Sequence, residues 1–306
     1  MLLYTIRRLL TLIPVLLGVS FLTFAIAQVT PGDPAALALG TNATPEAIAA
    51  LRQQLGLDDP FLVQYGRYVW NALHGDLGTS IRGQTPVLQE ILQRLPSTVE
   101  LTVAAMLIAI VLGVGAGIIA ATTRHRSLDG ATMVTSLVGL SIPNFWLAIL
   151  LIIVFGVNLK WISVTGGEGL ADLLLPAFVL ALAPAAVLAR LTRSSIKEVV
   201  REDYVRTARA KGLSLRQVIR VHVVRNSLIP VITVIGLQTA ALLGGAVFIE
   251  AVFARPGLGR FAVNAIANRD YPQVQGVVLF AALVYVLVNL GVDLLYGVLD
   301  PRIRYD

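Results

Sequence analysis

The sequence predicts an all-α integral membrane protein with six transmembrane helices and a small helical extracytoplasmic subdomain between helices 1 and 2. Three observations predict this fold class. Hydrophobic residues make up 56% of the 306 residues and charged residues only 14%, whereas a soluble domain is about 25% charged. Apolar runs recur near the roughly 20 residues that a helix needs to cross the hydrocarbon core. Basic residues gather between two such runs, because residues 190–230 hold ten of the 24 Lys and Arg.

Six apolar segments are long enough to span a bilayer, and they cover residues of about 9–29, 98–122, 132–157, 173–190, 228–249 and 276–298. The fourth segment is short and contains Pro176 and Pro184. Proline removes a helix hydrogen bond, so we expect this span to be kinked or partly broken. Small residues in the second and fifth spans predict close helix–helix approach at Gly113, Gly115, Gly117, Gly236, Gly244 and Gly245.

The charge distribution predicts the orientation in the membrane. With the N-terminus inside, the inside segments hold 16 of the 24 Lys and Arg and are the shorter in total. The positive-inside rule therefore places both termini in the cytoplasm. The net charge of +6 is thereby explained without nucleic acid as a partner. The first apolar run exceeds the roughly 7–15 residues of a signal peptide, so we expect it to be retained as a helix.

Four segments follow from these spans. Residues 1–30 form the N-terminal transmembrane helix, and residues 31–96 the extracytoplasmic helical subdomain. Residues 97–298 form a five-helix core that contains a cytoplasmic loop over 191–227, and residues 299–306 are a cytoplasmic tail. Each boundary lies where the apolar pattern gives way to polar residues.

Three helices are predicted within the subdomain. Thr44 is suited to the N-cap of the first, with Pro45 at its first position and Gly56 after its end. The second covers 60–73 and the third 86–95. Two interpretations are equally favoured: the subdomain is a lid that packs on the bundle, or it is a docking surface for an external partner.

Chemistry-bearing residues are sparse. The chain has three His and no Cys, and the His spacing fits no metal site. Asp293 is the only acid well inside a span, and we interpret it as a structural partner. This composition argues against an intramembrane enzyme and against a stand-alone secondary transporter, which usually carries more intramembrane charge.

None of the three lysines follows a glycine, so no P-loop is present. If ATP drives this protein, another subunit binds it.

One loop carries the pattern of a known family. Residues 203–212 read DYVRTARAKG, and residues 225–230, RNSLIP, close the loop. This resembles the coupling loop of bacterial ATP-binding-cassette importer permeases, in which an EAA-like triplet precedes a glycine. Arg206, Thr207 and Ala208 occupy the triplet and Gly212 the glycine. The missing Glu and the long gap from Gly212 to Pro230 match the peptide-importer branch of the family.

The resemblance covers nearly the whole chain. Seven further short motifs stand in the order of that branch: RR at 7–8 with PGDP at 31–34, QLGL at 54–57, GDLG at 75–78, LTRSS at 191–195, PGLGR at 256–260, RDYP at 269–272 and DPRIR at 300–304. The chain is therefore similar to the B-type permease of dipeptide, oligopeptide and glutathione importers. The resemblance implies the type I importer fold and a place in the bacterial cytoplasmic (inner) membrane.

The resemblance also implies a mechanism and partners. The loop would sit in a groove of an ATPase subunit, with contacts from Tyr204, Arg206, Thr207, Ala208, Arg209, Ala210, Lys211 and Gly212. Partners would be a homologous C-type permease, two ATP-binding subunits, an extracytoplasmic peptide-binding protein and the lipid bilayer. This chain would hold no cofactor, since ATP and Mg would be bound by the ATPase subunits. A basic loop lying on anionic lipid would explain the charge alone, but not Ala208 and Gly212 at this spacing.

Two further groups of residues are candidates for function. Polar or helix-breaking residues within the spans are candidates for the translocation path, or for kinks and interhelical hydrogen bonds: Pro143, Asn144, Gln238 and Asn289. The third outer loop is expected to meet the binding protein through Pro256, Gly257, Arg260, Arg269, Asp270 and Tyr271. The predicted function is the permease subunit of an ATP-driven importer of short peptides. The alternative is a stand-alone secondary transporter of a small solute.

Overall fold

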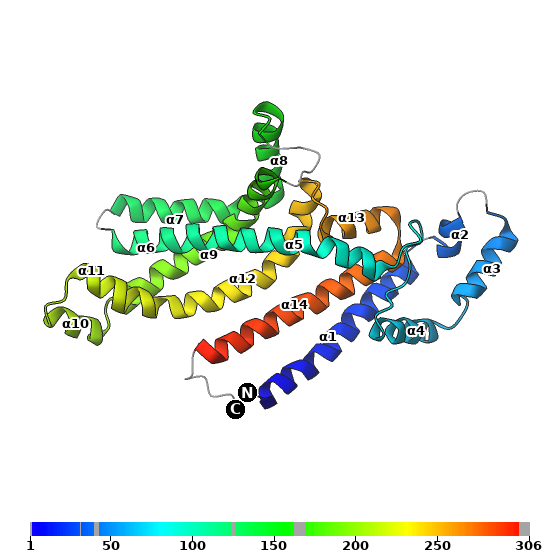
Figure 1. The fold of residues 1–306 in the computed structure, drawn as a ribbon, viewed down its shortest axis with the longest axis horizontal. Coiled ribbons are helices and arrows are strands. Elements are labelled where there is room, and N and C mark those ends of the chain that lie inside the picture. The colour runs from blue at the N-terminus through cyan, green and yellow to red at the C-terminus, as the bar shows by residue number, and fades with distance from the viewer. Residues whose placement is uncertain (1, 31, 40–42, 124–125, 162–168, 300–306) are drawn as a thin grey trace. The chain divides into compact units, whose positions relative to one another are not determined.

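The computed structural model describes residues 2–30, 32–39, 43–123, 126–161 and 169–299. These residues are almost entirely helical, and the described part of the chain contains no β-strand (Figure 1). In chain order the helices are α1 (Leu2–Val29), α2 (Pro34–Leu39), α3 (Pro45–Leu55), α4 (Phe61–Leu73), α5 (Val87–Ala109), η1 (Ile110–Val114), α6 (Gly115–Thr122), α7 (Arg126–Ser141), α8 (Asn144–Leu151), η2 (Ile152–Asn158), α9 (Leu170–Val199), α10 (Asp203–Ala210), α11 (Leu215–Gln217), η3 (Val218–Val223), α12 (Val224–Val252), α13 (Leu258–Asn268) and α14 (Tyr271–Leu299).

Five of the six predicted spans are continuous helices that are long and apolar enough to cross a membrane within the described residues. They are Leu9–Val29, Val87–Thr122, Asp172–Val199, Val218–Val252 and Tyr271–Leu294. The elements labelled η are π-helical turns within these runs or at the end of α8. The prediction of an all-α membrane protein is confirmed.

The third predicted span is divided at Pro143. Helices α7 and α8 meet there at 95°, and α8 with η2 stands at a steep angle to α7 in Figure 1. Pro143 has no N–H to donate and disfavours a helical conformation in the residue before it. Its carbonyl instead accepts the first hydrogen bonds of α8, from the N–H groups of Trp146 and Leu147 at 3.0 and 3.1 Å. The two halves count as one span only if the bent pair is taken together.

The fourth span corrects the expectation of a broken helix. Helix α9 is continuous through Pro176 and Pro184, and it runs well past residue 190 to Val199. Prolines are tolerated in membrane helices because neighbouring helices and local adjustments satisfy the freed carbonyls. Helix α9 has such neighbours, since it contacts α6, α7, α8 and α12.

The segment between the first two spans is partly as predicted. The Thr44 hydroxyl accepts a hydrogen bond from the N–H of Ala47, and Gly56 ends α3 in the left-handed conformation with φ +63°. Helix α4 matches the predicted 60–73. The third predicted helix, 86–95, is wrong as a separate element, because α5 continues through Pro96 into the second span. The short helix α2 was not predicted, since its sequence begins in a turn-like PGDP cluster.

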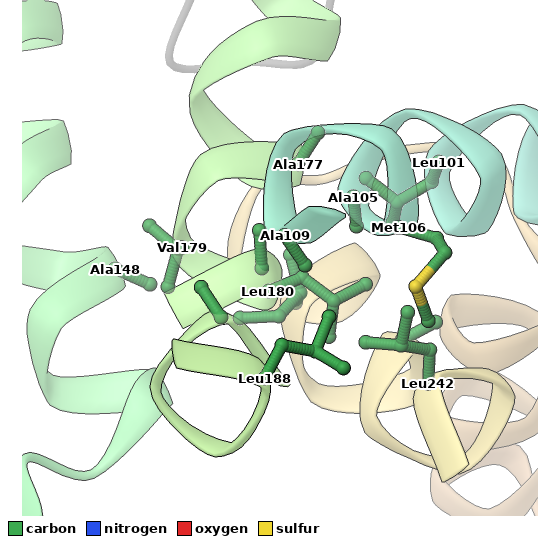
Figure 2. Packing of buried hydrophobic residues seen from close by; sticks show 14 of the residues in the cluster. Leu101, Ala105, Met106, Ala109, Ala148, Ala177, Val179, Leu180, Leu188 and Leu242 are labelled. Atoms are coloured by element: carbon green, nitrogen blue, oxygen red, sulfur yellow. The ribbon is translucent and has the colours of Figure 1, made fainter. Parts of the chain in front are cut away.

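The residues form two compact units. The core unit comprises residues 98–255 and 288–299, and the flanking unit comprises residues 2–97 and 256–287. The core unit is built on an apolar cluster from α5, α8, α9 and α12, shown in Figure 2. Leu101 and Met106 of α5 meet Leu180 and Leu188 of α9, with Leu242 of α12 beside them.

Two glycines set the separation of the second span from α9. A Cβ added at Gly113 would lie 2.5 Å from the carbonyl oxygen of Ala185, and one at Gly117 would lie 2.6 Å from that of Ala189. Only glycine permits this approach of one backbone to the other. Gly236 packs against the side chain of Val292, and Gly245 lies near the side chain of Leu180, whereas Gly115 and Gly244 have open space beside them. Close approach is thus confirmed at Gly113, Gly117 and Gly236.

We predict opposite effects for two neighbouring alanine substitutions. Gly113→Ala places a methyl group against a backbone carbonyl and should destabilise the protein by about 1–3 kcal/mol. Gly115→Ala has helical dihedrals and no neighbour within 4 Å, so it should stabilise the helix by about 0.5–1 kcal/mol. Unfolding by SDS in mixed micelles measures both changes. Equal unfolding midpoints would show that the contact with α9 does not depend on Gly113.

An ion-pair network organises the start of the flanking unit. Arg52 of α3 donates from Nη1 to Asp33 at 2.9 Å and from Nη2 to Asp58 at 2.7 Å. The N–H of Ala35 also donates to Asp33 at 3.0 Å, which anchors the first turn of α2. Partial burial alone would raise the pKa of Asp33. The hydrogen bonds from Arg52 and Ala35 and the positive charge of Arg52 outweigh it, and the pKa is lowered overall.

The lowered pKa of Asp33 predicts an acid-sensitive joint between α2 and α3. A carboxyl with a depressed folded-state pKa contributes stability above its unfolded pKa, near 3.9, and loses that contribution as the pH falls through the folded-state pKa. Protection factors for amide exchange in residues 33–58 should therefore drop between pH about 6 and about 3. Asp33→Asn should lower protection at the higher pH and flatten the dependence. Glu46→Gln, at an exposed acid of α3, should keep the wild-type profile.

Candidate coupling surface

Helix α10 presents the predicted coupling residues. Glu202, in extended conformation, precedes it, and Asp203 lies in its first turn, where the helix dipole favours an acid. The helix ends at Ala210, and Gly212 follows with φ +85°. Glycine adopts this left-handed conformation without the steric cost that other residues carry. Gly212 therefore forms the turn between α10 and the helical piece that follows it.

A reciprocal cap begins the second helical piece. The Ser214 N–H donates to Oε1 of Gln217 at 3.2 Å, and the Gln217 N–H donates to the Ser214 hydroxyl at 3.4 Å. This capping box satisfies backbone donors at the start of α11. Helix α11 then continues through η3 into α12. We did not predict this cap from the sequence, although the Ser-x-x-Gln pattern carries its signal.

The inner face of α10 is packed. Val205 and Ala208 are buried together with Ile196 at the end of α9 and with Val218 and Val223 of η3. The small side chain of Ala208 lets α10 lie close to its neighbours. Because these residues form a closed apolar cluster, the loop is a fixed part of the core unit.

Two polar contacts add to this packing. The buried Ser195 hydroxyl of α9 donates to the carbonyl oxygen of Ser227 in α12 at 2.9 Å. The Asn226 side chain donates to the Tyr204 hydroxyl at 3.0 Å and so joins α10 to the start of α12. Ser195, Ser227 and Asn226 lie within motifs that resemble the family, but no role was predicted for these three residues. Their partners are distant in sequence, so no local pattern shows these contacts.

The outer face of the same segment is exposed and basic. We call it the basic surface, defined by the exposed residues Arg206, Arg209, Lys211, Arg216 and Arg220. Tyr204, Thr207, Ala210 and Gly212 are also exposed, whereas Ala208 is buried. The eight predicted coupling residues therefore divide into seven at the surface and one beneath it. Arg206 pairs with Asp203 at 3.6 Å, but both side chains are highly exposed, so this ion pair contributes little stability.

The predicted path residues lie on three elements of the core unit. Pro143 and Asn144 form the bend between α7 and α8, and Gln238 and Asn289 are half-buried on α12 and α14. Their role in a translocation path stays a prediction.

The predicted binding-protein contacts fall in and around α13. Pro256 and Arg269 are exposed, Arg260 is half-buried, and Gly257 is buried. Asp270 and Tyr271 are 2% and 8% exposed. Asp270 accepts a hydrogen bond from the Ser80 hydroxyl at 2.6 Å and others from the N–H groups of Arg82 and Gln273. In this structure the side chains of Asp270 and Tyr271 are covered, and Asp270 anchors the loop at residues 80–82.

Comparison with known proteins places the chain in a family. Residues 113–305 match the family described as binding-protein-dependent transport system inner membrane component, and residues 1–102 match its N-terminal membrane component. Among curated relatives, the dipeptide transport system permease protein DppB of Alkalihalophilus pseudofirmus is 45% identical over the whole of both chains. The glutathione transport system permease protein GsiC of Escherichia coli is 47% identical, also over the whole of both chains.

Solved structures support the same fold. The membrane subunit fold of the MetNI methionine ABC transporter, in an inward-facing conformation, superposes with a TM-score of 0.57 at 18% identity and covers 70% of this chain and 97% of that one. An amino acid ABC transporter superposes with a TM-score of 0.54 at 14% identity, over 68% and 93% of the two chains. The helical membrane architecture and the full-length matches lead to one conclusion: the chain belongs to the family of binding-protein-dependent transport system inner membrane components.

Proposed function

We propose that this chain is the permease subunit of an ATP-driven importer of short peptides in a bacterial inner membrane. It would form half of the translocation path together with a homologous C-type permease. The family membership and the names of the relatives, which transport dipeptides or glutathione, support this proposal. Both termini and the basic surface would face the cytoplasm, as the distribution of Lys and Arg indicates.

The observation that carries the proposal is the two-sided construction of α10. Its inner face is held by Val205 and Ala208 in the apolar cluster, and its outer face exposes Arg206 and Arg209. Because the inner face of α10 is packed against the core unit, a force that a partner protein exerts on the exposed basic face would be transmitted without deforming the helix. A loop that only lay on lipid would need no such anchoring to α9 and α12.

ATP would be bound by other subunits. The sequence has no Gly-Lys pair and hence no P-loop. Two ATP-binding subunits would hold ATP and Mg, and an extracytoplasmic peptide-binding protein would deliver the substrate. When the ATPase subunits close, displacement of α10 would pass through Val205, Val218 and Ser195 to the ends of α9 and α12. The two helices would then reorient together.

Reversing one charge on the basic surface tests this mechanism. Arg209→Glu should leave the fold intact because the side chain is exposed. It should lower peptide-stimulated ATP hydrolysis by the reconstituted importer at least about ten-fold, since a buried like-charge contact at an interface costs several kcal/mol. Arg82→Glu, at an exposed arginine of the flanking unit, is the matched control and should retain the wild-type rate. Both variants are compared in proteoliposomes with an ATP-regenerating system.

Copurification in mild detergent distinguishes the remaining outcomes. The wild-type chain should bring down a second six-span permease and a P-loop ATPase, and Arg209→Glu should lose the ATPase. If the chain purifies alone and takes up peptide without ATP, the proposal is wrong and secondary transport is the function. If Arg209→Glu keeps full stimulation, coupling occurs elsewhere on the chain.

A further inference from the structure

The flanking unit contains a partly open cavity of about 520 Å³ that the coupling mechanism does not use. It lies among the end of α1, the start of α2, the end of α3, α4, the loop at residues 79–84 and the first turn of α14. Ligand pockets for small molecules typically measure about 300–1,000 Å³. The cavity is therefore of a size to take a small molecule or a short stretch of polypeptide.

The lining of this cavity mixes apolar side chains with polar ones and carries no charged side chain. Five of the eleven glutamines in the sequence line it: Gln28, Gln54, Gln64, Gln84 and Gln275. A carboxamide offers two donors and an acceptor. The wall is thus rich in groups that both donate and accept, while it has nothing to neutralise a charge.

Some of these glutamine carboxamides are hydrogen-bonded within the lining of the cavity, and others are available to bind a ligand. Gln64 is fully engaged, since it accepts from Gln28 at 2.7 Å and donates to the carbonyl oxygens of Leu57 and Asp59 at 2.9 and 2.8 Å. By contrast, the carboxamides of Gln54 and Gln275 make no hydrogen bond with any described residue. The fixed amides shape the site, and the available ones can meet a ligand.

One lining group, the hydroxyl of Tyr271, is buried without a polar partner among the described residues. Tyr271 is 8% exposed, and its hydroxyl has no hydrogen-bond partner within the described part of the chain. Gln275, one turn further along α14, is 9% exposed. Leaving a buried polar group unsatisfied costs about 1–3 kcal/mol. A hydrogen-bonding occupant of the cavity would remove this cost for the Tyr271 hydroxyl, so that group points to a ligand.

We propose that the cavity binds the main chain of an extended, uncharged peptide segment. Peptide groups alternate a donor with an acceptor, which the carboxamides of Gln54 and Gln275 and the Tyr271 hydroxyl complement. A free dipeptide held wholly inside would bury two charged termini with no counter-charge, which is strongly unfavourable. The segment is therefore the interior of a longer peptide or a loop of a partner protein.

Photo-crosslinking to the full-length chain in nanodiscs tests this site. The probe is a tripeptide, Ala-photoleucine-Ala, with acetylated N-terminus and amidated C-terminus, and its twin has free termini. The blocked probe should label residues 24–34, 51–64, 79–84 or 271–275 at least about ten-fold more than the free one. Labelling elsewhere, or equal labelling by both probes, would overturn the proposal.

Matched substitutions connect the labelling to the lining. Tyr271→Phe removes only a hydroxyl, and Gln54→Leu removes one amide, so each should cut labelling at least about five-fold without lowering the thermal midpoint. Gln53→Leu makes the same chemical change at the neighbouring residue, which does not line the cavity, and should label like the wild type. Undiminished labelling of both Tyr271→Phe and Gln54→Leu would show that the probe is not held by these groups.

Competition identifies the source of the segment. If an extracytoplasmic binding protein displaces the blocked probe, the natural occupant is a loop of that partner. If only a longer uncharged peptide displaces it, the occupant is transported peptide. If neither displaces it, the site does not recognise extended main chain and the proposal is wrong. Because labelling requires no ATPase, Arg209→Glu should label normally, so this inference and the coupling proposal fail separately.

Discussion

The backbone contact of Gly113 and Gly117 with α9 is the constraint on which the core unit depends. It fixes how deeply α9 lies against the second span, and α9 in turn contacts α7, α8 and α12. The same helix carries Ser195 and Ile196 near its end, where they hold α12 and the base of α10. The contact of these two glycines with α9 therefore determines the position of the basic surface within the core unit.

Hydropathy predicted where helices run, but it could not predict how proline acts in each of them. Pro143 breaks its span because its carbonyl starts a new helix at a steep angle, whereas Pro176 and Pro184 lie in a continuous helix with neighbours on several sides. Pro96 likewise lies inside α5, so a predicted boundary between two helices does not exist. The outcome depends on the surrounding helices, which a single sequence does not reveal.

The local features of the candidate site were accessible from sequence, and the long-range ones were not. Gly212 and Ala208 stand at characteristic spacing, and the structure gives each a physical role in the turn and the packing. The contact of Ser195 with Ser227 and the gathering of Gln28, Gln54 and Gln275 join distant segments. Asp270 and Tyr271 were expected to meet the binding protein because they lie in the third outer loop, yet tertiary packing covers their side chains.

The continuous helix Val218–Val252 has a consequence for the membrane. Its 35 residues span about 52 Å at about 1.5 Å per residue, while the hydrocarbon core is about 30 Å thick. Even with a tilt of about 20°, several turns must stand beyond the acyl chains. Arg220 and Arg225 are exposed at the start of this helix. The turns that extend beyond the hydrocarbon core are therefore those at this end, beside the basic surface. The basic surface is thereby raised clear of the lipid headgroups, in water where a soluble protein can reach it.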